Sequence, residues 1–122
     1  MSLKIAAITF DCTNNATELA TFWSAALDRL IDSGDAESAP FFASIGRENP
    51  TPGEPVLMFI AVPEPKTVKN RTHLDLDATD REAEVERLVG LGATVVHDKE
   101  EWGVRWTTLT DPAGNEFCVA EH

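Results

Sequence analysis

The chain of 122 residues repeats one order of predicted elements, a strand, a helix and further strands, in each of its halves. Alternating apolar residues define the strands, and apolar residues at helical spacing define the helices. Asn15 and Thr79 are the predicted helix caps, and Gly92 is the predicted end of the second helix. Superposing the two caps relates the halves by an internal duplication of roughly sixty residues, which is too long for a solenoid repeat. The predicted strands are residues 3–12, a weaker 31–35, 40–45 and 55–62 in the first half, and 72–78, 94–97, 104–110 and 116–120 in the second.

The composition is that of a compact soluble protein. With 43% hydrophobic residues the chain can build a core. A net charge of −11 argues against binding nucleic acid or an anionic membrane by bulk electrostatics, and the apolar runs are too short to span a bilayer. The first residues lack the features of a signal peptide, and Cys12 and Cys118 form no disulfide framework. We therefore expect a cytoplasmic protein with reduced thiols.

A tight hairpin near the C-terminus is the most specific local motif. In Asp111-Pro-Ala-Gly-Asn115 the proline presets φ, and Gly or Asn tolerates positive φ. Four further pieces occur in order along the chain: Phe22-Trp23, Val62-Pro-Glu-Pro-Lys66, Lys69-Asn-Arg-Thr-His-Leu-Asp-Leu76 and Leu91-Gly-Ala93. With these pieces the chain resembles the glyoxalase-like branch of the glyoxalase/bleomycin-resistance/extradiol-dioxygenase (vicinal-oxygen-chelate) superfamily.

The resemblance implies an α+β fold. Two tandem βαβββ modules would form a curved mixed sheet, with helices on its convex side and a ligand cleft on its concave side. Residues 1–122 would be a single glyoxalase-like domain, with module one at about 3–62, a linker at 63–71 and module two at about 72–121. We expect a homodimer, because a curved sheet leaves exposed edges that the related proteins pair about a two-fold axis.

Strand alternation assigns side chains to the two faces of this sheet. In the strand that opens module two, Leu74 and Leu76 point one way, and His73 and Asp75 point the other. The implied fold packs the leucines under the helices, so that His73 and Asp75 face the cleft.

The last strand of each module is expected to supply the rest of the cleft. Glu116 and Cys118 share one face, and Leu57 and Phe59 are their predicted counterparts in module one. Phe59 would give the cleft an aromatic wall, and Trp106, in the middle of its strand, could either join this wall or lie in the core. An aromatic wall suits an organic ligand better than ionic chemistry.

The resemblance also implies four places at which metal-dependent members hold their ion. His73 matches one of them, and Cys118 occupies a second that is usually glutamate. The other two fall on Ile8 or Thr9 and on Phe59, which are not credible ligands. Because a catalytic site wants about three protein ligands, we expect no cofactor. A divalent metal held by His73, Cys118 and Glu116 is the alternative.

Three basic residues, Lys66, Lys69 and Arg71, fall within the predicted linker of a very acidic chain. Lys69 and Arg71 could clamp an anion, or they could pair with acidic residues at a subunit interface. Asn70, between them, is a further candidate for ligand contact or for the turn itself.

The sequence leaves three functions open. The first is the binding of a small polar or anionic organic molecule, with or without metal-independent acid–base chemistry by His73 with Asp75 or Glu116. The second is a metal-dependent glyoxalase-type lyase or dioxygenase that uses His73 with Cys118 or Glu116. The third is a non-catalytic, resistance-type protein that sequesters its ligand. The sequence contains no Ser-His-Asp arrangement, phosphate loop or dinucleotide motif.

Overall fold

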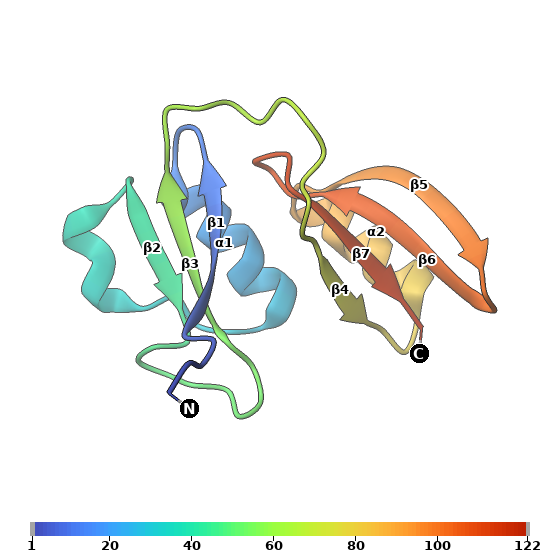
Figure 1. Ribbon diagram of the computed structural model, residues 1–122, viewed down its shortest axis with the longest axis horizontal. Helices are drawn as coiled ribbons and strands as arrows, with labels where there is room; N and C mark the ends of the chain where they lie inside the picture. Colours follow the sequence, from blue (N-terminus) through green and yellow to red (C-terminus); the bar gives the residue numbers. More distant parts are fainter. Residues whose placement is uncertain (1, 122) are drawn as a thin grey trace. The chain divides into compact units, whose positions relative to one another are not determined.

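The computed structural model describes residues 2–121, which form seven strands in two mixed sheets and three helices. Its contacts divide the chain into two compact units (Figure 1), one ending at Pro65 and the other starting at Lys66. Each unit contains a strand, a helix and further strands in the predicted order, and the predicted α+β fold is confirmed. Within the described part of the chain, no helix combines the length and apolar character needed to cross a bilayer.

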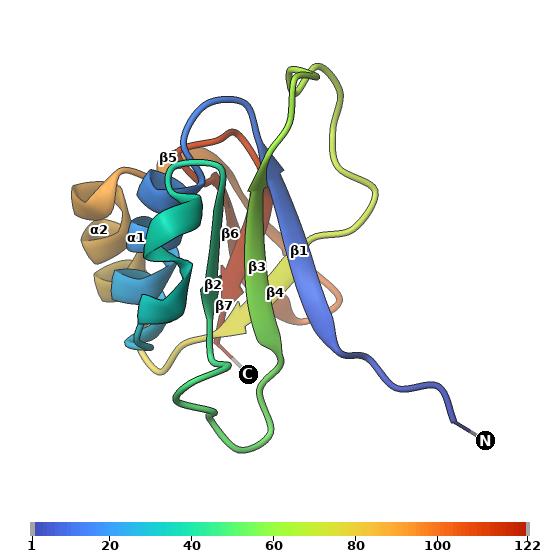
Figure 2. The same ribbon diagram turned by 90° about the vertical axis from the view of Figure 1, so that its left-hand side faces the viewer.

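The first unit is a three-stranded sheet with a helix against one face (Figure 2). Its middle strand pairs in parallel with the first strand and antiparallel with the other. Asn15 caps the helix as predicted, because its side chain accepts a hydrogen bond of 3.0 Å from the Glu18 N–H. The elements are β1 (Ala7–Cys12), α1 (Ala16–Leu27), the 3-10 helix η1 (Ser33–Ser38), β2 (Phe42–Ile45) and β3 (Val56–Ala61).

The prediction of a weak strand at residues 31–35 is wrong. Only Ile31 makes a bridge, to Ile45, and the chain then turns into η1. The buried carboxylate of Asp32 explains the turn, because it accepts hydrogen bonds from Ser44 Oγ at 2.6 Å and from the Glu48 N–H at 2.7 Å. A carboxylate that collects donors in this way favours a compact loop over an extended ladder.

The second unit is a four-stranded sheet in the order β4-β7-β6-β5, in which β4 and β7 are parallel and the other pairs are antiparallel. Helix α2 packs against one face of this sheet (Figure 1). Its cap is Asp80 rather than the predicted Thr79: the Asp80 carboxylate accepts from the Ala83 N–H at 3.1 Å, and its charge suits a helix N-terminus. Gly92 ends the helix as predicted. The elements are β4 (Leu74–Asp77), α2 (Arg81–Leu91), β5 (Thr94–Glu101), β6 (Val104–Thr110) and β7 (Glu116–Ala120).

The register of β1 and β3 corrects the predicted position of Phe59. Phe59 pairs with Phe10, stacks on it at 5.3 Å between ring centroids and is fully buried. Phe10 in turn stacks on Trp23 of α1 at 5.4 Å. Phe59 therefore lies on the helix side of its sheet and belongs to the core, not to a cleft wall. A shift of one residue along a strand reverses the face, and this is the error in the prediction.

The two units have equivalent parallel pairs that show which residue corresponds to Cys118. Asp75 pairs with Cys118 in the second unit, and Asp11 pairs with Ile60 in the first. Ile60, rather than Phe59, is thus the counterpart of Cys118, and it offers no ligand atom either.

Candidate functional site

A hollow of about 490 Å³ opens on the sheet of the second unit, and every residue that lines it belongs to that unit. Strand alternation explains which face it occupies. Thr107 accepts a hydrogen bond of 2.6 Å from Arg81 of α2, so its neighbour Thr108 points to the opposite face. The lining residues are Lys69, His73, Asp75, His97, Lys99, Trp102, Val104, Trp106, Thr108, Glu116, Cys118 and Ala120.

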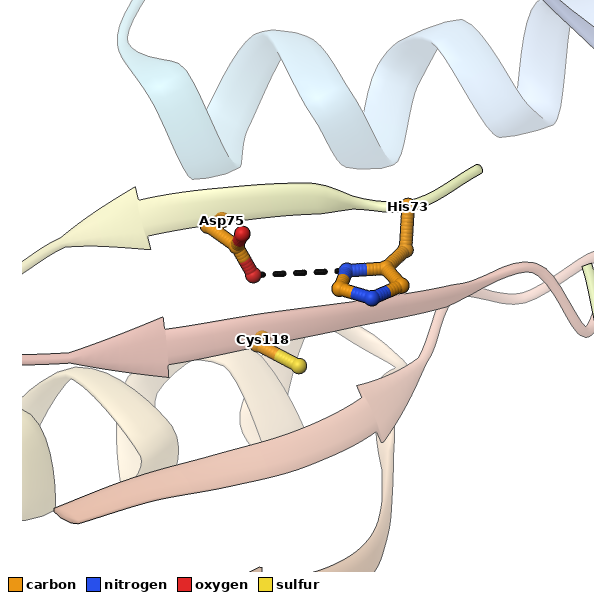
Figure 3. Close-up of side chains that lie close together, drawn as sticks. All are labelled: His73, Asp75 and Cys118. Carbon is orange, nitrogen blue, oxygen red and sulfur yellow. Dashed lines mark ion pairs between the residues drawn. The ribbon is translucent and has the colours of Figure 1, made fainter. Parts of the chain in front are cut away.

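Three of these side chains form a compact cluster (Figure 3). His73 Nδ1 lies 3.3 Å from Asp75 Oδ1, and one ligand atom from each of His73, Asp75 and Cys118 lies within 4.8 Å of the others. The strands impose this proximity, because Asp75 and Cys118 are direct neighbours in the β4–β7 ladder and His73 is two residues from Asp75. The sequence predicted all three as cleft residues, and the structure places them together.

The Cys118 side chain is the buried member of the cluster. Its Sγ lies 3.3 Å from Thr108 Oγ1 on the adjacent strand. Burial is the main reason that the pKa of the Cys118 thiol lies above its ordinary value; the Thr108 hydrogen bond acts in the opposite direction, and the nearby Asp75 raises the pKa further. Cys118 is therefore a protonated thiol near neutral pH.

Glu116 lines the same hollow, but its carboxylate is engaged elsewhere. Its Oε2 accepts from Lys66 Nζ and its Oε1 from the Asn70 N–H, both at 2.9 Å. Burial alone would raise the pKa of the Glu116 carboxyl, but these hydrogen bonds outweigh it and lower the pKa. Asn70 also donates through Nδ2 to Asn115 at 2.9 Å. Glu116 thus holds the segment before β4 onto the closing hairpin instead of joining the cluster.

The predicted anion clamp is only partly present at the hollow. Lys69 lines it, whereas Arg71 is exposed and is not a lining residue. Sequence reasoning missed two other basic side chains: it assigned no role to His97, at the end of the predicted strand 94–97, and it placed Lys99 beyond that strand. The strand continues to Glu101, and alternation then places both residues on the hollow's side of the sheet.

Two tryptophans form the apolar end of the site. Of its two predicted positions, core or cleft wall, Trp106 lines the hollow, and Trp102 stacks on it at 6.2 Å between ring centroids with 8° between the planes. Trp102 is 88% exposed. Phe59, the other predicted aromatic wall, is absent from the lining because it lies in the core of the first unit.

The repeated strand–helix–strand module defines a protein of the vicinal-oxygen-chelate fold. A family model described as the glyoxalase-like domain matches residues 7–120, and the chain belongs to this family. Among curated proteins, no significant match was found.

Several solved structures share the fold at low sequence identity. A glyoxalase/bleomycin resistance protein/dioxygenase family enzyme from Burkholderia phytofirmans has a TM-score of 0.73 and 16% identity, with 98% of each chain covered. A bleomycin-binding protein from Streptomyces verticillus, complexed with copper(II)-bleomycin, has a TM-score of 0.62 and 20% identity over 100% of this chain and 98% of that one. A fosfomycin resistance protein from Listeria monocytogenes, complexed with manganese(II) and a dihydroxypropylphosphonic acid, has a TM-score of 0.72 and 11% identity over 98% and 90%. At these identities the likeness establishes the fold alone.

Proposed function

We propose that the protein binds a small anionic organic molecule in the hollow of its second unit. The observation that carries this proposal is the charge of the lining. In a chain of net charge −11, the hollow gathers Lys69, Lys99 and two histidines beside an apolar, aromatic wall. A concave apolar surface with a few convergent polar groups is the usual form of a small-molecule site.

The two acidic residues of the lining do not outweigh its two lysines. Glu116 is paired with Lys66 at 2.9 Å, which leaves Asp75, 3.3 Å from His73 Nδ1, as the one carboxylate of the lining set against Lys69 and Lys99. Among residues 2–121, neither Lys69 nor Lys99 has a carboxylate within 4.0 Å of its ammonium group. Both ammonium groups can therefore serve an anionic ligand.

Two neighbours of the same fold support an anionic ligand, because both are fosfomycin resistance proteins and one is complexed with a phosphonic acid. A third neighbour binds bleomycin, which is not a small anion. A sequestering role and a catalytic role remain alternative forms of our proposal. In the catalytic form, the His73–Asp75 pair would hold and move a proton at a bound ligand, because a carboxylate on Nδ1 orients the imidazole.

Calorimetry on a double lysine variant and a matched control tests the proposal. A panel of small carboxylates and phosphonates, each compared with its neutral amide or ester, would be titrated into the protein. We expect at least one anion to bind, and Lys69→Met combined with Lys99→Met to weaken it about tenfold or more, as the loss of charge-assisted contacts predicts. Lys4→Met is the matched control, because Lys4 is exposed and lies in the first unit. Absence of binding by every anion, or equal weakening by the control, would refute the proposal.

A second candidate function follows from the His73–Asp75–Cys118 cluster. Its nitrogen, oxygen and sulfur donors fit the preferences of zinc, and three protein ligands are the number that catalytic zinc sites use. Such an ion would supply Lewis-acid activation of water or of a carbonyl group. The predicted alternative set included Glu116, but its oxygens already accept from Lys66 and Asn70, and Asp75 takes its place in the cluster.

We favour the metal-free form because His73 and Asp75 already pair with each other, and the buried Cys118 thiol contacts Thr108 Oγ1 and has a raised pKa. The expected result is that a chelator leaves the melting temperature unchanged. Elemental analysis that finds about one zinc, iron, nickel or manganese per chain, lost in His73→Ala, would favour the metal-dependent lyase or dioxygenase instead.

A further inference from the structure

The turn between β5 and β6 holds a tryptophan in a conformation that suits glycine or asparagine. Glu101 pairs with Val104, so the hairpin loop consists of Trp102 and Gly103 alone. Both have positive φ, 53° and 77°. Two-residue hairpins of this kind favour Asn-Gly, and a bulky side chain in the left-handed region is disfavoured. Such outliers cluster at functional sites, where the surroundings or the function maintain them.

Burial does not explain why a tryptophan occupies this turn. The Trp102 side chain is 88% exposed, so it contributes little to a core. What the position provides is a stack: its ring lies almost parallel to that of Trp106, and both line the hollow. The hairpin thus extends the aromatic wall of the site beyond the strands.

Basic side chains lie directly beside this stack. Lys99 is the cross-strand partner of Trp106, and His97 is two residues away on the same face of β5. Directly paired side chains of neighbouring strands lie about 5 Å apart at Cβ. A ring that rests on the tryptophans would therefore place a directly attached anionic group within reach of Lys99.

From this arrangement we infer the class of ligand: a planar aromatic or heteroaromatic acid, stacked on Trp102 and Trp106 with its anionic group at Lys99. The inference rests on the proposed function, because it concerns the same hollow. Aromatic faces stack with an offset at centroid distances of 4.5–7 Å, and a saturated ring of equal size cannot reproduce this contact.

A matched pair of ligands tests the inference. Naphthoate and its fully saturated counterpart, decahydronaphthoate, carry the same charge on skeletons of similar size. We expect calorimetry to show that the wild type prefers naphthoate by roughly two- to tenfold, the range expected from one aromatic stack. Trp102→Asn should abolish this preference. Because Asn-Gly is the favoured pair for this turn, the melting temperature of the Trp102→Asn variant should not fall by more than a few degrees.

Phe41→Ala is the matched control, because Phe41 is also an exposed aromatic residue, 67% exposed, but belongs to the first unit and does not line the hollow. The Phe41→Ala variant should leave the preference for naphthoate unchanged. If the wild type binds both acids equally, the stacking inference is wrong while the proposed function stands. If neither acid nor any other anion binds, both fail. The inference is overturned if Trp102→Asn binds naphthoate as the wild type does. In that case a lower melting temperature would assign Trp102 to the fold, and a lower molecular mass in light scattering would assign it to a subunit interface.

Discussion

Glu116→Ala offers a sharp test of the role that the structure gives to this carboxylate. The change removes the acceptor for Lys66 Nζ and for the Asn70 N–H, each at 2.9 Å. These two contacts attach the segment that carries Lys69 to β7. If Glu116 is a positioning residue, the variant should lose stability as well as affinity for the anionic ligand, because Lys69 is no longer held at the hollow.

The magnitude can be worked from the two contacts. The Lys66 ammonium is partly exposed and screened, so its ion pair should contribute less than about 1 kcal/mol. The partly buried Asn70 N–H would lose its acceptor, at a cost of about 1–3 kcal/mol. We therefore expect Glu116→Ala to lower the free energy of unfolding by about 1–4 kcal/mol. Glu116→Gln keeps an oxygen for the Asn70 N–H and should cost only about 1 kcal/mol or less.

Urea denaturation followed by circular dichroism measures both variants. A loss below about 0.5 kcal/mol in Glu116→Ala would contradict the reasoning from these contacts. The pH dependence provides a second check. Because folding lowers the pKa of Glu116, its stabilisation is present above the unfolded-state pKa of this carboxyl and is lost as the pH falls through the lower folded-state pKa. The difference between the wild type and Glu116→Gln should therefore shrink in acid.

Three further predictions follow from other parts of the chain. Phe59→Ala should cost about 3–5 kcal/mol of stability, measured by urea denaturation, and leave the affinity per folded molecule unchanged; a selective loss of binding would return Phe59 to the ligand site. Asp32→Asn should lower the free energy of unfolding near neutral pH. Hydrogen bonds from Ser44, Glu48 and Arg47 outweigh the effect of burial and lower the pKa of Asp32, so the difference in stability from the wild type should be lost in acid. We expect light scattering to give the mass of a homodimer. If Arg71→Ala weakens the dimer but not the ligand affinity, Arg71 serves the interface. If neither dimer dissociation nor ligand affinity changes, both predicted roles of Arg71 are excluded.

Local signals in the sequence predicted much of the fold. The cap at Asn15 and the helix end at Gly92 depend on side-chain and backbone preferences within a few residues, and both are confirmed. The closing hairpin is a similar case: the Asp111 carboxylate accepts from the N–H groups of Ala113 and Asn115, at 2.9 and 3.0 Å. Such contacts can be inferred from sequence because both partners lie in one short segment.

The errors arose where a contact joins distant segments. Nothing near Phe59 shows that it pairs with Phe10, and a register error of one residue reversed its face. The end of β5 is a separate case, because the partner strand β6 follows after a two-residue loop: the pairing extends β5 to Glu101, so the sequence missed Lys99 as a site residue. For Glu116, the decisive partners are Lys66 and Asn70, about fifty residues earlier in the chain.

Amide NMR shifts during a titration with naphthoate test the central claim most directly, because they locate the ligand on the chain. The proposal predicts that the largest shifts fall on residues 97–108 and 116–120, which contain most of the lining of the hollow. Lys69→Met combined with Lys99→Met should reduce these shifts at equal ligand concentration. Shifts centred on residues 7–61, or no shifts at any soluble concentration of naphthoate or of the anions in the panel, would contradict the claim that this hollow is an anion-binding site.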